Sequence, residues 1–408
     1  MPLQTILFVH PTLAHYHYPR LQALGRAASH SGVRVANIEL ADSMQAYPWG
    51  AQGQAETFQN LRLFPGQPLE ALSTSQMKSA LQPRLAELQP QVVFLYGYSL
   101  GIFRWARDWC DRQAAAAVLI SDSNDFDKPR YRVFEYLKSR LVRRYDAAFV
   151  GGTSSSLYLQ KLGLPAPRIV PGYDVIDVGY FARYAEKRRQ DLPHVRQKWQ
   201  LPQEYFLVVA RLVPEKNLPG LLAAYARYHQ QLQGRREPWP LVLCGSGPQE
   251  AELRKRLGEL PAAVRSNIHL LGHIRQPEII DLFAAAACLV LPSLSESWGL
   301  VVNEALACSL PVLVTNRAGC ARDLVQDGFN GWTFNPHDPD ELTSRLVQMT
   351  LLEADAREQM GNHSRARIAD WDLDRFASGA MQCARIALKH KHPSRLPAGE
   401  IPLAKEGR

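Results

Sequence analysis

The sequence lacks the cysteine patterns that hold metal ions or disulfide-stabilised folds together. Its six cysteines are scattered along 408 residues, and no two of them form a Cys-x-x-Cys pair. Several lie within apolar stretches, where a thiol acts as a small hydrophobic group. This usage favours a reducing compartment and argues against a zinc site. The twelve histidines are equally dispersed and include no His-Glu-x-x-His motif, so a zinc protease of that type is excluded.

Long hydrophobic runs are also missing. The longest apolar runs are far shorter than the roughly 20 residues that a helix needs to cross a bilayer. The N-terminal stretch reads as a short strand and lacks the basic and long apolar regions of a secretory signal. We therefore expect a cytoplasmic protein, with peripheral contact at the inner face of the membrane as an open alternative.

The chain has no acidic excess. Its 47 lysines and arginines outnumber its 39 acids and give a formal net charge of +8. This balance suits an anionic partner such as a nucleotide or a phospholipid surface, and it is equally compatible with solubility alone. The basic residues are dispersed, without a stacking motif or a zinc finger, so we expect no nucleic-acid partner.

What the sequence does contain is a regular alternation of short apolar runs and helix-patterned segments. Continuous apolar runs, as opposed to alternating ones, are typical of parallel strands covered on both faces. Their alternation with helices indicates βαβ units. The expected strands are 5–10, 33–40, 91–97, 116–122 and 147–152, then 205–211, 240–247, 268–274, 288–293 and 311–315. The expected helices of the second half are 217–233, 249–259, 276–287, 299–309 and 339–349.

The length and one break in this alternation predict the domain organisation. A chain of 408 residues is too long for one hydrophobic core. We predict an α/β protein with two Rossmann-like, doubly wound parallel-sheet domains facing each other across a cleft. Ligands of such sheets bind beyond the carboxyl ends of the strands. The predicted parts are an acceptor-binding domain over 1–175, a connection over 176–203, a second domain over 204–370, a helix over 371–390 that packs back toward the first domain, and a polar tail over 391–408.

Two acids stand in an otherwise apolar stretch, "LPSLSESWGLVVNEALACSLPVLVT". Glu296 follows an expected strand, and Glu304 lies about one turn into the next helix. The helix begins near Gly299 and offers the unpaired backbone N–H groups of about Gly299, Leu300 and Val301 to an anion. Carboxylates suit vicinal diols, which both a sugar and a ribose carry. The less specific interpretation is a capping acid and an exposed helix residue.

Two cations and two glycines follow other strands of the second half. Arg211 and Lys216 stand at one strand-to-helix turn, where they could hold a diphosphate and neutralise charge as it leaves. A solvated ion pair of Lys216 with Glu215 is the alternative interpretation. Gly245 and Gly247 follow the next strand and allow a ligand to approach the backbone closely. They do not form a Gly-x-Gly-x-x-Gly dinucleotide fingerprint.

Together these motifs resemble family-4 glycosyltransferases of the GT-B fold. Arg211-x4-Lys216-Asn before a helix, then "GSGP", "LGHI" and the Glu-x7-Glu pair follow one another in the order and spacing of that family. The match covers about residues 203–345, and the N-terminal half resembles the family only in architecture. The resemblance implies a retaining transfer of a sugar from a nucleotide-diphosphate sugar to an acceptor hydroxyl, without a metal or other cofactor.

The resemblance also implies roles for individual residues. Arg211 and Lys216 would bind the diphosphate, Glu296 would bind sugar hydroxyls, and Glu304 would bind the ribose. The remaining sugar-donor contacts would come from Gly245, Gly247, His273, Ile274, Ser297, Trp298, Gly299, Leu300 and Val301, with the segment after "LLG" against the base.

The N-terminal half departs from the family pattern. Its first loop, "HPTLAHYHYPR", lacks the glycines that family members often carry, so His10, His15, His17 and Arg20 are candidates for acceptor or phosphate contact. The family often places a catalytic-site histidine after a strand of this half. Here Asp122 or Asn124 stands at that point, and the choice among these two residues and the three histidines stays open, with Asp122 as our first choice.

The acceptor is expected to be a glycan or a lipid-linked molecule, in the synthesis of a cell-surface polysaccharide or glycolipid. The segment 128–146 is rich in Arg and Lys and places Tyr131, Phe134, Leu137, Leu141 and Val142 at helical spacing, which suits an anionic membrane surface. A packed helix with a solvated charged face is the alternative. A nucleotide-sugar 2-epimerase of the same fold and a non-enzymatic anion-binding protein are the alternative functions.

Overall fold

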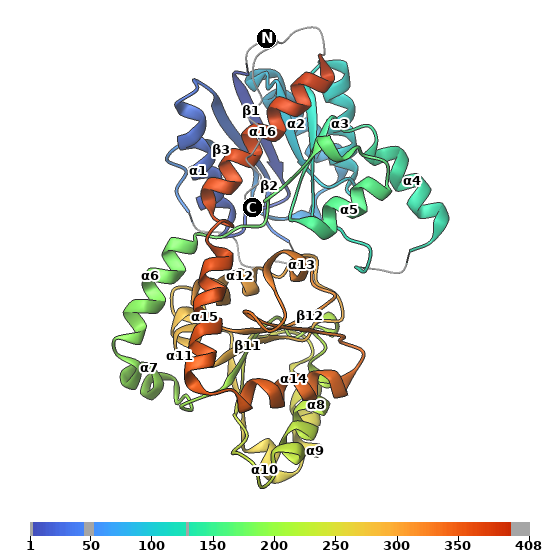
Figure 1. Ribbon diagram of the computed structural model, residues 1–408. Helices are drawn as coiled ribbons and strands as arrows, with labels where there is room; N and C mark the ends of the chain where they lie inside the picture. The colour runs from blue at the N-terminus through green and yellow to red at the C-terminus, as the bar shows by residue number, and fades with distance from the viewer. Residues whose placement is uncertain (1–2, 45–52, 128–129, 393–408) are drawn as a thin grey trace.

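The computed structural model describes residues 3–44, 53–127 and 130–392, and it consists of two α/β domains stacked along one long axis (Figure 1). Most of the polar tail predicted over 391–408 lies outside these residues. Each domain is built on one parallel sheet with helices on both faces. This is the architecture of two doubly wound parallel sheets that the sequence predicts.

The first domain contains a seven-stranded sheet in the order β3-β2-β1-β4-β5-β6-β7. Its strands are β1 (Thr5–His10), β2 (Arg34–Ser43), β3 (Gln59–Pro68), β4 (Val92–Tyr96), β5 (Ala116–Ser121), β6 (Ala147–Val150) and β7 (Ile169–Pro171). Its helices are α1 (His17–Ser29), α2 (Thr74–Leu88), α3 (Gly101–Arg112), α4 (Arg132–Val142) and α5 (Thr153–Lys161). The strands β3 and β7 were not predicted. Both are edge strands, and the exposed, Pro- and Gly-containing β3 has no continuous apolar run.

The second domain contains a six-stranded sheet in the order β10-β9-β8-β11-β12-β13, a Rossmann strand order. Its strands are β8 (Phe206–Val209), β9 (Leu241–Cys244), β10 (Ile268–Gly272), β11 (Cys288–Leu291), β12 (Val312–Thr315) and β13 (Gly331–Phe334). Its helices are α8 (Leu218–Leu232), α9 (Glu250–Glu259), α10 (Ala262–Arg265), α11 (Ile279–Ala285), α12 (Leu300–Ala307), α13 (Ala321–Leu324), α14 (Pro339–Leu351) and α15 (Ala354–Ile368). The edge strand β13 and the helix α15 were not predicted.

Two crossings connect the domains. The polar segment after residue 175 forms α6 (Val178–Arg189) and α7 (Leu192–Trp199) and contributes no strand. After α15, the helix α16 (Leu373–Lys391) returns to the first domain and lies across its sheet (Figure 1). The Phe376 ring of α16 packs 5.2 Å from Phe149 and 5.8 Å from Tyr173.

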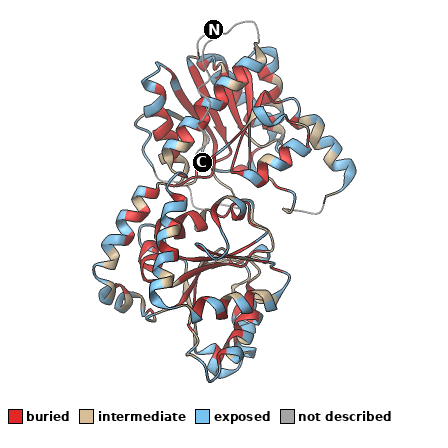
Figure 2. Ribbon diagram, in the orientation of Figure 1, coloured by how far each residue is buried: buried red, intermediate tan, exposed pale blue. Residues whose placement is uncertain are grey.

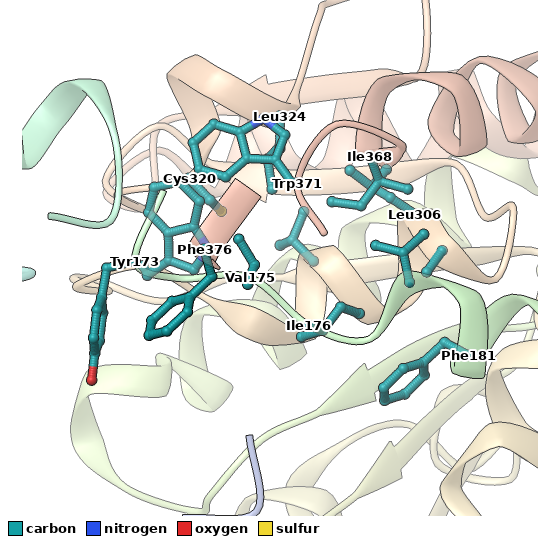
Figure 3. Close-up of a cluster of buried hydrophobic side chains, with 14 of the residues drawn as sticks. Tyr173, Val175, Ile176, Phe181, Leu306, Cys320, Leu324, Ile368, Trp371 and Phe376 are labelled. Atoms are coloured by element: carbon teal, nitrogen blue, oxygen red, sulfur yellow. The ribbon is translucent and has the colours of Figure 1, made fainter. Parts of the chain in front are cut away.

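The apolar residues at these crossings form one continuous core with parts of both domains. Figure 3 shows Tyr173, Val175, Phe376, Trp371 and Leu306 within one cluster, to which different segments of the chain contribute. Most strands and the inward helix faces are buried, as Figure 2 shows. The junction between the sheets is therefore bounded by packed side chains, and this packing positions the loops that follow β1, β5, β8 and β11.

Candidate active site

The predicted cation and the first predicted acid of the second domain are in direct contact. Lys216 Nζ forms an ion pair with Glu296 Oε2, and Ser293 Oγ donates to the same carboxylate at 3.4 Å. The loops after β8 and β11 are joined beside this pair, because the backbone N–H of Leu294 donates to the Glu215 carbonyl at 2.8 Å. Lys216 and Glu296 are each about one-fifth exposed, so both remain open to a ligand. The alternative pairing of Lys216 with Glu215 is absent among the described ion pairs.

Arg211 lies in the same loop as Lys216 and is half-buried. The backbone on either side of it is fixed to the loop after β9, since Ala210 N donates to Cys244 O and Leu212 N donates to Ser246 O, at 3.0 and 2.9 Å. This pairing brings Arg211 to the same sheet edge as Lys216.

The two glycines after β9 are required by this loop contact. A Cβ on Gly245, whose φ is +147°, would stand 1.8 Å from the Ala210 carbonyl oxygen, and a Cβ on Gly247 would stand 2.5 Å from that of Leu212. The close approach that their small size permits is therefore made by the neighbouring loop, which carries Arg211.

The helix α12 begins directly behind Glu296. Gly299 is its N-cap and has a φ of +103°, a conformation that favours glycine. A Cβ at this position would lie 3.1 Å from Leu291 and 3.3 Å from the Cγ of Glu296. The backbone N–H groups of Leu300 and Val301 have no partner within the helix and carry the positive end of its dipole, whereas that of Val302 donates to the Gly299 carbonyl. An anion held by Lys216 would meet these groups.

Glu304 lies inside α12 and is buried. It accepts a hydrogen bond from the Tyr16 hydroxyl, which comes from the loop after β1 in the other domain, and another from the Gln276 side chain. Burial raises the pKa of the Glu304 carboxyl to about 7, because the charged form loses water. The loop after β10, with exposed His273 and half-buried Ile274, thus borders Glu304 through Gln276.

Trp298 lies between the two acids in sequence, but its indole packs away from them. The indole N–H donates to Asn303 Oδ1 at 2.9 Å, and the ring lies 5.0 Å from that of Trp371. The indole also contacts the backbone at Gly151 and Gly152, where a Cβ would fall within 3 Å of it. Its side chain is therefore part of the interdomain core, and Ser297 beside it is exposed.

Two of the three candidate histidines are already engaged by the protein. His10 contacts Asn37 Oδ1 through Nδ1 at 2.7 Å and the Tyr173 hydroxyl through Nε2 at 3.2 Å. Burial lowers the pKa of His10 to about 4, so its ring is neutral at pH 7. His17 Nδ1 accepts the backbone N–H of Ala14 at 2.8 Å. His15 is exposed, with its ring against Tyr16.

The two polar residues after β5 differ in their contacts. Asn124 is buried, and its Nδ2 donates to the Ser297 carbonyl of the other domain at 3.2 Å. Asp122 is half-buried, and its carboxyl group shares a hydrogen bond with the Asp174 carboxyl group. Burial raises the pKa of Asp122 well above its usual range, and the neighbouring Asp174 carboxyl adds to this effect. The protonated form of Asp122 is therefore favoured at the junction.

Some contacts at the junction were not anticipated from the sequence. Arg20, a candidate for phosphate contact, is instead fully buried: its Nε donates to the Val175 carbonyl at 2.9 Å, and its Nη2 lies 3.5 Å from Asp174 Oδ1. The Asp174 carbonyl in turn accepts from Asn303 Nδ2 at 3.2 Å. Neither Asp174 nor Tyr16 belongs to a recognisable motif. Only the position of Asp174, in the "YD" directly before the polar connection between the domains, could have indicated its role.

The described residues contain no group of three or more His, Cys, Asp or Glu side chains that could hold a metal ion. Within the same ranges, no helix combines the length and the apolar character that spanning a membrane requires.

Comparison with known proteins relates the site to one family. Residues 191–367 match the family model of glycosyl transferases group 1. The serotype-specific mannosyltransferase WbdA of Escherichia coli is 26% identical over 273 residues, which are 63% of this chain and 32% of WbdA. The O-antigen chain mannosyltransferase B of Escherichia coli is 30% identical over 246 residues, 58% of this chain and 61% of that protein. The chain thus spans about one-third to three-fifths of the length of these relatives.

Among solved structures, Anabaena HepE in complex with UDP-glucose has a similar fold. Its TM-score is 0.66 at 17% sequence identity, and the superposition covers 93% of this chain and 98% of HepE. At this identity the similarity establishes a shared fold.

Proposed function

We propose, from the match of residues 191–367 to the family model of glycosyl transferases group 1, that the protein is a retaining glycosyltransferase that moves a sugar from a nucleotide-diphosphate sugar to an acceptor hydroxyl. One observation carries the proposal. The ion pair of Lys216 and Glu296 lies directly before the start of α12, and a second acid, Glu304, lies one turn inside that helix. A cation, a helix start and two acids meet at one sheet edge.

In the proposed complex the diphosphate replaces Glu296 as the ion-pair partner of Lys216. Lys216 and Arg211 hold its negative charge together with the first N–H groups of α12. Glu296, released from Lys216, accepts hydrogen bonds from sugar hydroxyls. As the bond between sugar and diphosphate breaks, charge grows on the leaving group, and the two cations stabilise it in the transition state. Fixed cations of this kind supply the charge without a metal ion.

The ribose of the sugar donor would bind Glu304. Because Tyr16 occupies this carboxylate, its hydroxyl must move away, or share the carboxylate, when the ribose arrives. The base would lie against the loop after β10, at His273 and Ile274. The first domain then presents the acceptor from the loops after β1 and β5.

Asp122 is our proposed contact from the first domain to the donor sugar. Its carboxyl group is paired only with another carboxyl group, that of Asp174, whereas Asn124 is bound to the Ser297 carbonyl and His10 to Asn37. A neutral carboxyl group can both donate to and accept from a sugar hydroxyl.

The names of the relatives suggest the substrates to test. WbdA and the O-antigen enzyme are named mannosyltransferases, so we propose a nucleotide-diphosphate mannose as the first sugar donor and a surface-polysaccharide glycan as the acceptor.

The test is transfer and binding with the full chain. Purified protein is screened by thermal shift against nucleoside diphosphates and nucleotide-diphosphate sugars, because a ligand that binds only the folded state raises its apparent stability. The stabilising sugar donor is then incubated with mannose-containing oligosaccharides, with and without EDTA. We expect an elongated product of unchanged anomeric configuration in both cases. Conversion of the sugar donor without acceptor would instead indicate an epimerase, and dependence on a divalent metal would refute the metal-free proposal.

A further inference from the structure

The helix α4 is exposed along much of its length (Figure 2), and the exposed residues in and next to it include several large hydrophobic side chains. In the described part of the chain, every large hydrophobic side chain that is more than half exposed lies between residues 131 and 137. These side chains are Tyr131, Val133, Phe134, Tyr136 and Leu137, with exposed fractions of 51 to 70%. Single exposed hydrophobic residues are common, but five in seven positions indicate a contact surface.

The polarity of α4 is the reverse of that of an ordinary surface helix. Its inward face is held mostly by polar contacts: the Tyr158 hydroxyl donates to Glu135 at 2.9 Å, and Ser139 Oγ donates to the Leu162 carbonyl at 2.7 Å. Val142 is the one buried residue of α4. A surface helix normally turns its apolar stripe toward the core.

The outward face of α4 is correspondingly apolar. Val133, Tyr136, Leu137 and Arg140 stand at i, i+3, i+4 and i+7, so they share one side of the helix. The rings of Tyr131 and Phe134 pack edge to face, with centroids 6.2 Å apart, next to this side. Val142, which the sequence pattern placed on the exposed face, belongs to the inner face.

Basic side chains flank these apolar groups. Arg132, Arg140 and Arg143 are exposed, and within the described ranges none of them has an ion pair. The single acid of this segment, Glu135, is on the inner face and paired with Lys138 at 2.7 Å. The exposed side of α4 therefore combines apolar and aromatic groups with uncompensated positive charge.

We propose that this surface docks on the surface of an anionic lipid bilayer. The α4 surface, as we call it, consists of Tyr131, Val133, Phe134, Tyr136 and Leu137 with Arg132, Arg140 and Arg143. The helix lies in the plane of the interface, its apolar side chains enter the boundary between headgroups and acyl chains, and its arginines bind lipid phosphates. Tyrosine suits this position because its ring is apolar and its hydroxyl remains in water.

Charge favours a bilayer over a second copy of the chain. In a two-fold symmetric contact the same surface meets itself, so the three arginines of one copy would face those of the other. No exposed acid on α4 would compensate them. A bilayer that contains anionic lipid supplies the opposite charge and the apolar phase together.

The position of the α4 surface also relates it to the proposed site. It begins nine residues after Asp122, in the same connection that follows β5. If the proposed transfer holds, docking through α4 would bring a lipid-linked acceptor to the edge of the site. The docking itself does not depend on that function.

The test is cosedimentation of the full chain with liposomes of phosphatidylcholine alone and with about 30% phosphatidylglycerol. We expect binding to the anionic liposomes only. The double variant Phe134→Asp/Leu137→Asp and the double variant Arg132→Glu/Arg140→Glu are each expected to lower the bound fraction at least tenfold. Their matched controls are Leu351→Asp, an exposed apolar position in the other domain, and Arg183→Glu/Lys187→Glu, which changes the net charge by the same amount on α6.

Three outcomes would overturn the proposal. If the wild-type protein does not cosediment with anionic liposomes, the α4 surface is not a docking surface for a bilayer. An equal loss in the Arg183→Glu/Lys187→Glu control would mean that net charge alone drives binding. A concentration-dependent dimer in sedimentation velocity that the Phe134→Asp/Leu137→Asp variant abolishes would assign the α4 surface to a second copy. Circular dichroism of each variant establishes that it is folded, and none of these readouts requires sugar transfer.

Discussion

Lys216 and Glu296 illustrate how site residues satisfy one another before a ligand arrives. Each is only partly exposed, and each neutralises the charge of the other. A half-buried ion pair of this kind contributes little to stability compared with its cost when one partner is removed. The pair holds two side chains in the geometry that the proposed sugar donor needs, and it can be exchanged for contacts with phosphate and hydroxyl groups.

The first prediction concerns Lys216. Lys216→Ala should lower kcat for sugar transfer by about a hundredfold to a thousandfold, the scale seen when one electrostatic contact to developing charge is lost. The measurement is steady-state kinetics with the sugar donor found by thermal shift. Lys198→Ala is the matched control, because Lys198 also pairs with acids, Glu278 and Asp281, but on α7 and α11. Turnover of Lys216→Ala at the wild-type rate would refute the proposed role of Lys216.

The second prediction concerns the buried carboxyl of Glu304. Its pKa rises from 4.5 in the unfolded chain to about 7 in the folded one. Between these values the folded state binds more protons than the unfolded state, so stability falls as the pH rises from about 4.5 to 7. Glu304→Gln removes the buried charge. The free energy of unfolding of the variant minus that of wild type should therefore be larger at pH 8 than at pH 5, by up to about 3 kcal/mol.

Urea unfolding at both pH values measures this difference. The exposed Glu259→Gln serves as the control and should show the same relative stability at pH 5 and pH 8. If the stability of Glu304→Gln relative to wild type were also the same at pH 5 and pH 8, the Glu304 carboxyl would not titrate in this range.

At the scale of single elements, the site depends on loops that touch through glycine. The loops after β8 and β9 meet where Gly245 leaves room for the Ala210 carbonyl, and α12 begins at a left-handed Gly299. Strand, turn and helix each follow from local sequence. The contact between two such units follows from the parallel pairing of β8 with β9.

The third prediction tests this contact. Gly245→Ala should destabilise the protein by about 1 to 3 kcal/mol and impair sugar-donor binding, because the new Cβ meets the backbone beside Arg211 at an unfavourable φ. Gly258→Ala is the matched control: a Cβ there has nothing within 4 Å inside α9, and alanine favours a helix. Thermal unfolding of the two variants compares them. Equal melting temperatures would contradict the argument.

At the scale of the whole molecule, the chain unites its two domains by returning to the first one. The helix α16 lies across the first sheet, and the core around Tyr173, Trp371 and Phe376 contains residues of both domains (Figure 3). Loops of both domains also bond directly, as when Thr153 Oγ1 donates to Asp323 at 2.6 Å. The relative position of the two site halves is thus a property of the complete fold.

The fourth prediction belongs to this scale. Phe376→Ala should lower the free energy of unfolding by about 3 to 5 kcal/mol, because the ring is buried among Phe149, Tyr173 and Phe8. Phe329→Ala, at a partly exposed phenylalanine of the second domain, should cost much less. Urea unfolding followed by fluorescence checks both. A small effect of Phe376→Ala would show that α16 is not needed to hold the first domain together.

Much of the fold was predictable because a strand that is buried on both faces has a continuous apolar run in the sequence. The runs at 5–10 and 288–293 are continuously apolar, and both form central strands. The edge strand β3 was missed because it is partly solvated, so its sequence need not be continuously apolar. The edge strand β13 is mostly buried, but it has only four residues, and Gly331 and Thr333 interrupt its apolar run. The helix α15 was missed for a related reason: it is mostly polar, with few buried residues.

The sequence by itself determined the two parallel-sheet domains, the strand-to-helix turns with Arg211, Lys216 and Glu296, and the helix that carries Glu304. These features depend on residues near one another in the chain. Only the tertiary structure decided that Tyr16 reaches Glu304, that Trp298 packs in the core, and that α4 turns its apolar side outward. Such contacts join segments that are distant in sequence, and their geometry arises only when the sheets and crossing helices pack together.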